Sequence, residues 1–288
     1  MTTDLQRFAE PDFWRTTAPT LHVDDCDFLL GDKPLRMTAP ELKTLSAEVA
    51  KEGYTRFKPR RWTIDVAALA ATIADLKARQ IMPVFAFVFD EAWCLFREIR
   101  PYLAKMLGPE YRMLPDFWAW HVEASDRDGG WQPHRDKGGR SLFVDGRPKS
   151  MTTWIALSEA TPENGCIYLV PADRDPAYNT AEDDQFKFGL GDIRALPCGP
   201  GTVLSWNQAV LHWGSRSSVR AKAPRISVAF EFQRGDVPPF NVPLLDPATP
   251  PPFATRLGLI AKQILQYQHI YPLSAEMKAF AERAVAGR

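Results

Sequence analysis

A series of short apolar segments, separated by glycine and proline, restricts the fold of this chain more than any other feature. Before residue 111 the apolar residues recur every three or four positions, as in helices, whereas after it they form short aromatic or β-branched stretches. We expect strands at 117–122, 151–157, 166–170, 192–196, 202–206, 211–213 and 225–233. Many short strands between turn residues are typical of an antiparallel sandwich, barrel or jelly roll.

The last expected strand, 225–233, has two different faces because side chains alternate along a strand. Its apolar face consists of Ile226, Val228, Phe230 and Phe232. Its polar or small face consists of Arg225, Ser227, Ala229, Glu231 and Gln233. We expect the apolar face to pack on another layer and the polar face to line a cavity.

The residues before the strands predict a helical layer. Thr38 is suited to cap a helix that ends at Gly53, and Asp65 is suited to cap a second helix. A third helix is expected after Asp90, with a kink at Pro101 because proline lacks the backbone N–H of a helix interior.

The residues after the strands begin with a proline-rich strap. Residues 238–252 contain seven prolines and are expected to run extended, followed by helices at 254–267 and 274–286. We therefore expect a single domain over residues 1–288, mainly β with flanking helices. Its parts are a helical N-terminal layer at 1–110, a β core at 111–235, and the strap with the C-terminal helices at 236–288.

The charge balance limits the kinds of partner. The 35 Lys and Arg residues equal the 35 Asp and Glu residues, so the formal net charge is zero, and no long run of one sign occurs. Nucleic acids and anionic membranes attract clustered positive charge, so we expect a small-molecule substrate instead. The first residues lack the profile of a secretory signal, and the four cysteines form no C-x-x-C pair, which predicts a cytoplasmic protein. No sequence feature specifies an oligomeric state.

A histidine and an aspartate two residues apart, His134 and Asp136, are the first candidates for metal ligands. On an extended segment, side chains two positions apart point the same way, so both can reach one ion. His212 lies 78 residues later in another expected strand. Two imidazoles and one carboxylate form the facial triad of non-haem Fe(II) sites, which leaves three coordination positions open.

Arg225 adds a site for an anion. It follows His212 by thirteen residues and lies on the polar face of the last strand. A guanidinium inside a cavity requires an anion, and it binds a carboxylate through two parallel hydrogen bonds.

Two further motifs occur in order between these residues. Residues 163–171 read Glu-Asn-Gly-Cys-Ile-Tyr-Leu-Val-Pro, and residues 201–206 read Gly-Thr-Val-Leu-Ser-Trp. Together with the triad and Arg225, they resemble the phytanoyl-CoA dioxygenase family of Fe(II)- and 2-oxoglutarate-dependent oxygenases over residues 117–233. The resemblance implies a double-stranded β-helix, or jelly-roll, core that uses Fe(II), 2-oxoglutarate and O2.

The resemblance also implies roles for individual residues. The catalytic iron ligands are His134, Asp136 and His212; Arg225 holds the distal carboxylate of 2-oxoglutarate, and Trp154 borders this co-substrate or fills the core. The family often has a hydroxyl residue two positions after the second histidine, where this chain has Gly214, so Ser215 or Ser227 is expected to supply the hydroxyl. Trp131 and Gln132, beside the metal motif, are expected to contact the substrate.

Asp136 favours hydroxylation over halogenation, because relatives that halogenate have a small residue in its place and bind chloride there. The expected reaction is hydroxylation of an unactivated C–H bond of a small molecule with release of succinate and CO2, or a related desaturation or rearrangement.

The substrate class stays open among acyl-CoA thioesters, amino acids, carrier-tethered groups and natural products. Lys137 and Arg140 could meet an acidic substrate, Arg135 is expected to be solvated, and residues 172–191 could form a lid.

Three alternatives account for part of this pattern. A nucleic-acid demethylase would use the same triad and arginine, but it requires a basic face. A non-catalytic or carbohydrate-binding jelly roll explains the strands and leaves the four polar residues without a role. A zinc hydrolase would use the three ligands but gives Arg225 no function.

Overall fold

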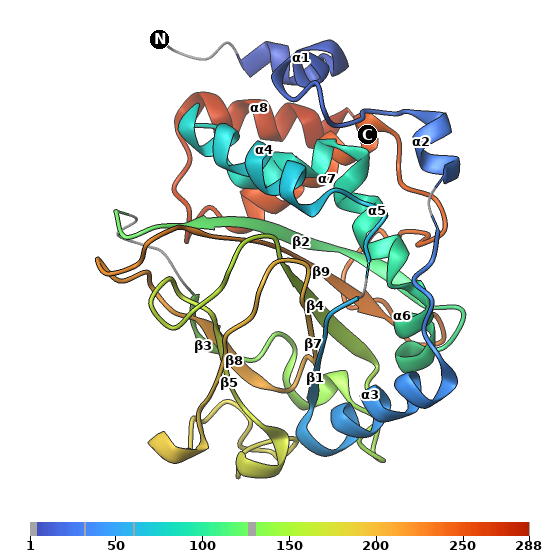
Figure 1. The fold of residues 1–288 in the computed structure, drawn as a ribbon, viewed down its shortest axis with the longest axis vertical. Helices are drawn as coiled ribbons and strands as arrows, with labels where there is room; N and C mark the ends of the chain where they lie inside the picture. Colours follow the sequence, from blue (N-terminus) through green and yellow to red (C-terminus); the bar gives the residue numbers. More distant parts are fainter. Residues whose placement is uncertain (1–4, 32, 60, 126–130, 288) are drawn as a thin grey trace.

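A computed structural model describes residues 5–31, 33–59, 61–125 and 131–287. Two antiparallel β-sheets form the centre of the molecule (Figure 1). The five-stranded sheet has the order β1 (Tyr54–Phe57), β7 (Val203–Asn207), β4 (Ser150–Ala156), β9 (Arg225–Gln233) and β2 (Arg112–Val122). The four-stranded sheet has the order β3 (Trp131–His134), β8 (Leu211–Gly214), β5 (Ile167–Val170) and β6 (Arg194–Leu196). Apolar side chains from both sheets, including Trp154, Leu169 and Leu204, pack together between them.

Helices cover the outer face of the five-stranded sheet. In Figure 1, α4, α5, α7 and α8 stack over this sheet, while the four-stranded sheet lies on its opposite side. The α-helices are α1 (Pro11–Thr17), α2 (Cys26–Gly31), α3 (Ala39–Glu52), α4 (Val66–Ala78), α5 (Asp90–Glu98), α6 (Arg100–Leu107), α7 (Phe253–Gln266) and α8 (Ala275–Ala286). No helix in the described ranges is long and apolar enough to span a membrane.

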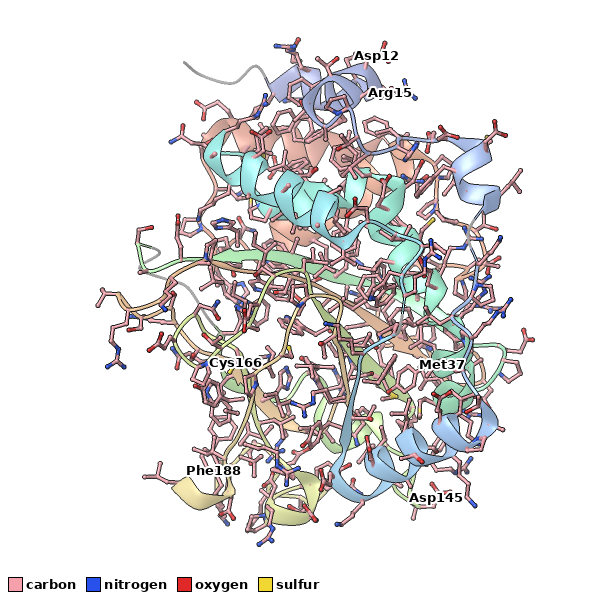
Figure 2. The ribbon with its side chains drawn as sticks, in the orientation of Figure 1. Asp12, Arg15, Met37, Asp145, Cys166 and Phe188 are labelled. Carbon is pink, nitrogen blue, oxygen red and sulfur yellow. The ribbon has the colours of Figure 1, made fainter. Side chains whose placement is uncertain are left out.

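Strand β9 has the two faces expected from its alternation. On the apolar face, Phe230 packs against the helical layer, with its ring centroid 5.4 Å from Trp93 and 5.5 Å from Phe96. The polar face includes Arg225 and Glu231, which line a cavity between the sheets. Side chains fill the space on both sides of the sheet (Figure 2).

The helix-capping predictions are confirmed. Thr38 forms a capping box with Glu41 at the start of α3, and Gly53 ends this helix in the left-handed region with a φ of 79°. Asp65 accepts hydrogen bonds from two backbone N–H groups at the start of α4. The expected kinked helix after Asp90 is instead two helices, α5 and α6, because Pro101 occupies the first turn of a new helix, where its missing N–H is tolerated.

The expected strands are present with small shifts in their ends, but two observed strands were not predicted. Both β1 and β3 have four residues, too few to show alternation. β2 also begins five residues earlier than expected, because a bulge between Met113 and Phe117 interrupts its pattern. The four cysteines, Cys26, Cys94, Cys166 and Cys198, are all free, in agreement with the absence of a paired-cysteine motif.

Candidate active site

The structure brings the three expected metal ligands together. His134 at the end of β3 lies directly opposite His212 on β8, and their ring centroids are 4.4 Å apart. Asp136 follows β3, with Oδ1 at 3.4 Å from His134 Nε2 and 3.6 Å from His212 Nε2. All three candidate ligand atoms lie within 4.8 Å of one another. Their proximity follows from the pairing of β3 with β8.

Backbone contacts orient both imidazoles. His134 Nδ1 is 2.7 Å from the carbonyl oxygen of Gln132, and His212 Nδ1 is 3.1 Å from that of Val210. A carbonyl oxygen can only accept, so each Nδ1 donates to it, and each Nε2 is the ring nitrogen that faces Asp136 and is available to a metal ion. Burial lowers the pKa of His212 to about 4, which keeps this ring neutral, as a metal ligand must be.

Two donors fix the carboxylate of Asp136. Thr152 Oγ1 donates to Oδ2 at 2.6 Å and Trp206 Nε1 donates to the same oxygen at 3.2 Å, so Oδ1 is left facing the histidines. Burial opposes ionisation of Asp136, but His212, His134 and Thr152 together hold its pKa well below the ordinary range. The sequence reasoning missed Thr152, although alternation along β4 places it on the same face as Trp154.

Arg225 lies in the same cavity without a carboxylate partner among the described residues. Its side chain is almost inaccessible, with the residue 2 % exposed, and its Nε makes no hydrogen bond. Its Nη1 donates to Ser227 Oγ at 3.3 Å, and its guanidinium carbon lies 5.8 Å from the ring centroid of Trp154. Burial lowers its pKa to about 10. A buried guanidinium without a counter-ion is the expected state of an anion site.

The remaining predicted site residues are divided between the cavity and its surroundings. Trp154, Trp131 and Gly214 line the cavity. Ser227 contacts Arg225, whereas the hydroxyl of Ser215 donates to the carbonyl of Arg216 and does not belong to the cavity lining. Gln132 is exposed and contributes its carbonyl to His134, so this geometry gives its side chain no place in the cavity wall. The predicted contacts of Ser215 and Gln132 therefore stay predictions without support from this geometry.

The cavity holds about 630 Å³, counted with the solvent at its mouth. Beyond the metal-ligand residues and Arg225, it has an aromatic wall that includes Trp118, Trp131 and Tyr267 and a pair of acids, Asp116 and Glu231. Sequence reasoning placed Glu231 on a cavity-lining face without giving it a role. It missed Asp116, because no motif surrounds this residue.

The two acids have different partners. Glu231 lies 2.9 Å from the ammonium of Lys137. Asp116 accepts hydrogen bonds from the amides of Asn241, at 2.9 and 2.8 Å, and of Gln266, at 3.1 Å. Burial raises the pKa of Glu231 to about 8 despite Lys137, and the charges of Asp116 and Asp136 add to this effect.

The basic residues next to the candidate metal ligands contact partners within the protein. Lys137 pairs with Glu231, and Arg140 stacks on Phe240 at 5.8 Å. The expectation of a solvated Arg135 is wrong, because its side chain is 3 % exposed and pairs with the fully buried Asp175 at 2.7 Å. It points away from the metal ligands, as alternation requires, but into protein rather than water. The expected lid, residues 172–191, is anchored through this contact.

Comparisons with known proteins support the family resemblance. A family model described as phytanoyl-CoA dioxygenase (PhyH) matches residues 37–223, which confirms the resemblance inferred from the motifs. A search of curated proteins returns no significant match.

Solved structures share the fold at low sequence identity. The non-heme monooxygenase ThoJ has a TM-score of 0.56 and 13 % identity, over 85 % of this chain and 100 % of that chain. The epimerase SnoN, in complex with Fe3+, alpha ketoglutarate and nogalamycin RO, has a TM-score of 0.53 and 17 % identity, over 73 % and 94 %. The non-heme alpha ketoglutarate dependent carbocyclase SnoK, from nogalamycin biosynthesis, has a TM-score of 0.53 and 16 % identity, over 74 % and 100 %.

Proposed function

Because the chain belongs to the phytanoyl-CoA dioxygenase family, we propose that it is an Fe(II)- and 2-oxoglutarate-dependent oxygenase that hydroxylates a small molecule. In this proposal, the two sheets form a double-stranded β-helix, the jelly roll of the family. The observation that carries the proposal is the buried Arg225, which has no carboxylate partner among the described residues and lies in one cavity with His134, Asp136 and His212. A metal site alone would suit several reactions, whereas a metal site beside a carboxylate-binding arginine suits a 2-oxo acid co-substrate.

The residues that line the cavity suit both Fe(II) and 2-oxoglutarate. Two neutral imidazole nitrogens and one carboxylate oxygen form a donor set that suits Fe(II) and leaves positions for further ligands. The guanidinium of Arg225 has an unused Nε donor, which matches the planar carboxylate of 2-oxoglutarate. We therefore assign His134, Asp136 and His212 to iron and Arg225 to the co-substrate. SnoN, a structural relative, is solved with Fe3+ and alpha ketoglutarate.

When bound, Fe(II) with 2-oxoglutarate and O2 supplies oxidising chemistry that releases succinate and CO2. The chain's own residues orient the participants. Arg225 fixes the distal carboxylate, with Ser227 holding one of its nitrogens and Trp154 lying near its guanidinium carbon. Trp131, whose ring centroid lies 5.5 Å from that of His134, forms a wall beside the metal ligands and excludes water from the reacting carbon.

Hydroxylation is the reaction that we propose, because Asp136 keeps its carboxylate in the position that halogenating relatives leave open. Structural relatives include an epimerase and a carbocyclase, so the fold accommodates other outcomes. The nucleic-acid alternative is disfavoured by the zero net charge and the absence of a long basic run, since binding of nucleic acid requires clustered positive charge. The zinc-hydrolase alternative gives the buried Arg225 no counter-ion.

The proposed function is tested by anaerobic addition of 2-oxoglutarate to the protein with Fe(II). We expect a weak visible metal-to-ligand absorption band and slow succinate release once O2 is admitted. Asp136→Ala should abolish both the band and succinate release without changing the far-ultraviolet circular dichroism spectrum. Absence of the band in the wild-type protein, together with absence of succinate, would overturn the proposal.

The role of Arg225 is tested separately by Arg225→Gln. Loss of a charge-assisted hydrogen-bonding pair should raise the KM for 2-oxoglutarate by roughly tenfold to hundredfold. Fe(II) affinity should stay unchanged. The matched control is Arg220→Gln, because the Arg220 side chain is 78 % exposed. An unchanged KM in the Arg225 variant would contradict the assigned role.

A further inference from the structure

Asp116 and Glu231 are brought together by an irregularity in the five-stranded sheet. Met113 pairs with Phe232 and Phe117 pairs with Phe230, so the single residue Glu231 on β9 lies opposite three residues of β2. Asp116 is the last residue of this bulge. Both acids line the cavity that contains the metal ligands. Bulges commonly redirect side chains next to active sites, and here the bulge directs a second carboxylate into the cavity.

The helical layer holds the bulge in this shape. Gln263 of α7 accepts a hydrogen bond from the backbone N–H of Phe117 at 3.2 Å and donates to the carbonyl of Pro115 at 2.5 Å. Gln266 of the same helix donates to Asp116. The position of Asp116 is therefore built into the fold, with both its backbone and its carboxylate held from α7.

The acids outnumber their cationic partners. Lys137 forms one ion pair, with Glu231, and Asp116 has only neutral amide donors among the described residues. Asp116, a residue that is 2 % exposed, therefore has no cationic partner among the described residues. The amides of Asn241 and Gln266 orient the Asp116 carboxylate but are neutral and do not cancel its charge, so this wall favours a ligand that brings a positive charge.

Aromatic rings connect the acids to the metal ligands. The centroid of Tyr267 lies 5.1 Å from Trp118 and 5.0 Å from Trp131, and Trp131 lies 5.5 Å from His134. All four residues line the cavity. Aromatic faces attract cations, most strongly where water is excluded, so the rings and acids favour the same kind of ligand.

We propose that the substrate carries a protonated amine, which binds to Asp116 and Glu231 against Tyr267 and Trp131, with its carbon chain directed toward the metal ligands. This inference rests on the proposed function and narrows its substrate class. A protonated amine complements the carboxylate of Asp116, whereas an anionic group placed at this wall would be repelled by it. The basic residues that could have received an acidic substrate have partners within the protein, since Lys137 pairs with Glu231 and Arg140 stacks on Phe240.

The test compares two series of three probes, and the probes of each series share a carbon skeleton and differ in the terminal group and its charge. 2-Phenylethylamine, 2-phenylethanol and 3-phenylpropionate are titrated by calorimetry into the anaerobic protein with Fe(II) and 2-oxoglutarate, and tryptamine, tryptophol and indole-3-propionate form a second series. We expect each amine to bind at least about tenfold more tightly than its alcohol, because the amine gains charge-assisted hydrogen bonds, and each carboxylate to bind most weakly. Equal binding of amine and alcohol in both series, tighter binding of the carboxylates, or no detectable amine binding would overturn the inference.

Two isosteric variants test whether Asp116 and Glu231 cause the preference for amines. Asp116→Asn keeps the size of the side chain, and it should reduce the preference for amine over alcohol by about tenfold while alcohol binding is unchanged. Glu231→Gln leaves Lys137 unpaired and should shift the preference toward the carboxylates. Asp12→Asn is the matched control, because the Asp12 side chain is 91 % exposed. Unchanged preferences in both cavity variants would overturn the assignment of these acids.

The visible absorption band separates this inference from the proposed function. A wild-type protein that forms the band with 2-oxoglutarate but does not prefer amines contradicts the amine site alone. A protein that prefers amines but never forms the band contradicts the oxygenase proposal alone. The probe series is therefore repeated with metal-free protein, in which the amine preference should persist.

Discussion

At the scale of single residues, each candidate metal ligand has one atom held by the protein and one left for the ion. The carbonyls of Gln132 and Val210 hold the Nδ1 atoms of the two histidines. Thr152 and Trp206 hold Oδ2 of Asp136. Gln208 in turn donates to the hydroxyl of Thr152 at 3.1 Å. Such outer contacts fix the orientation of ligands, so their loss should weaken metal binding without removing a ligand.

Thr152→Val tests this contact with nearly unchanged volume. We expect Fe(II) affinity to fall by roughly tenfold to hundredfold, because Asp136 loses its 2.6 Å hydrogen bond and gains rotational freedom. The measurement is an anaerobic competition titration against a fluorescent chelator. Thr153→Val is the control, since Thr153 lies on the opposite face of β4 and its hydroxyl contacts Ser205 at 2.9 Å. Equal losses of affinity in both variants would assign the effect to general destabilisation instead.

The residues of the candidate site were predictable to different degrees. His134, Asp136, His212 and Arg225 belong to motifs with fixed spacing, and the structure brings them into one cavity. Asp116 was not predictable, because its place depends on a bulge and on amides from α7 and from Asn241, far away in the sequence. The partner of Arg135 was missed for a related reason. Asp175 is 40 residues away in sequence (175 − 135), so no local pattern connects the two.

At the scale of elements, Arg135 joins the segment that carries the first two metal ligands to a long loop. It lies between His134 and Asp136, pairs with Asp175 and donates from Nε to the carbonyl of Asp183 at 2.7 Å. Its Nη1 also donates to the carbonyl of Ala209, in the turn before β8, at 2.8 Å. One guanidinium therefore connects β3, residues 175–183 and the approach to His212.

Arg135→Lys should retain a charge for Asp175 but lose the geometry of the fork, because an ammonium cannot reproduce the planar set of donors. We expect trypsin to cleave after Lys187, in the loop, about thirtyfold faster, since two hydrogen bonds of about 1 kcal/mol each no longer oppose local opening. The measurement is limited proteolysis followed by mass spectrometry. Arg147→Lys, in a pair whose side chains are 65 % and 53 % exposed, should leave this rate unchanged. A loop that is cleaved no faster in the Arg135 variant would contradict the anchoring role.

The ends of helices and strands were predictable where the sequence carries a local signal such as a capping residue. Capping residues and terminal glycine defined α3 within one residue, because these contacts lie inside the element itself. Strand β1 carries no such signal, because it is a four-residue edge strand that exists through its pairing with β7. The single helix expected after Asp90 became two, because a proline in the first turn starts a helix as readily as it kinks one.

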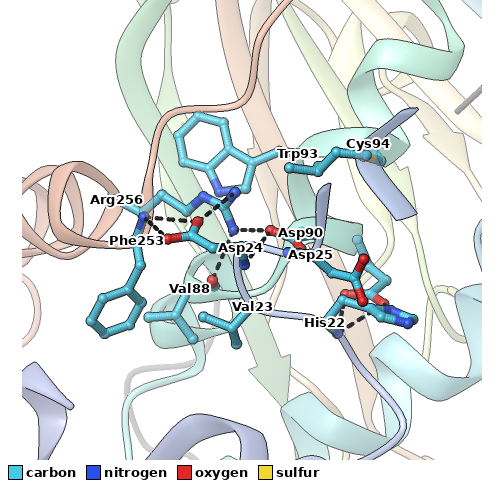
Figure 3. Close-up of polar contacts among 12 residues, drawn as sticks. His22, Val23, Asp24, Asp25, Val88, Asp90, Trp93, Cys94, Phe253 and Arg256 are labelled. Carbon is cyan, nitrogen blue, oxygen red and sulfur yellow. Dashed lines mark hydrogen bonds and ion pairs between the residues drawn. The ribbon is translucent and has the colours of Figure 1, made fainter. Parts of the chain in front are cut away.

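At the scale of the whole molecule, a buried ionic cluster joins segments that are distant in sequence. Figure 3 shows Arg256 of α7 with Asp90 of α5 and Asp24 of the N-terminal segment. Arg256 donates to Asp90 and to the carbonyl of Val88, and both side chains of the Arg256–Asp90 pair are completely buried. Asp24 accepts a hydrogen bond from the backbone N–H of Phe253 at 3.0 Å. None of these residues lines the cavity, so the cluster should control stability separately from the site.

Arg256→Met should lower the free energy of unfolding by about 3–5 kcal/mol, because it leaves Asp90 buried without a cation. The double variant Arg256→Met/Asp90→Asn should lose less than the sum of the two single variants, since it removes the unpaired charge. Urea denaturation measures both, and Arg79→Met, in an exposed pair with Asp75, should change stability by less than about 1 kcal/mol. Below its melting transition, the Arg256 variant should bind Fe(II) with wild-type affinity. A parallel loss of stability and Fe(II) affinity would show that this cluster also supports the metal ligands, although none of its residues lines the cavity.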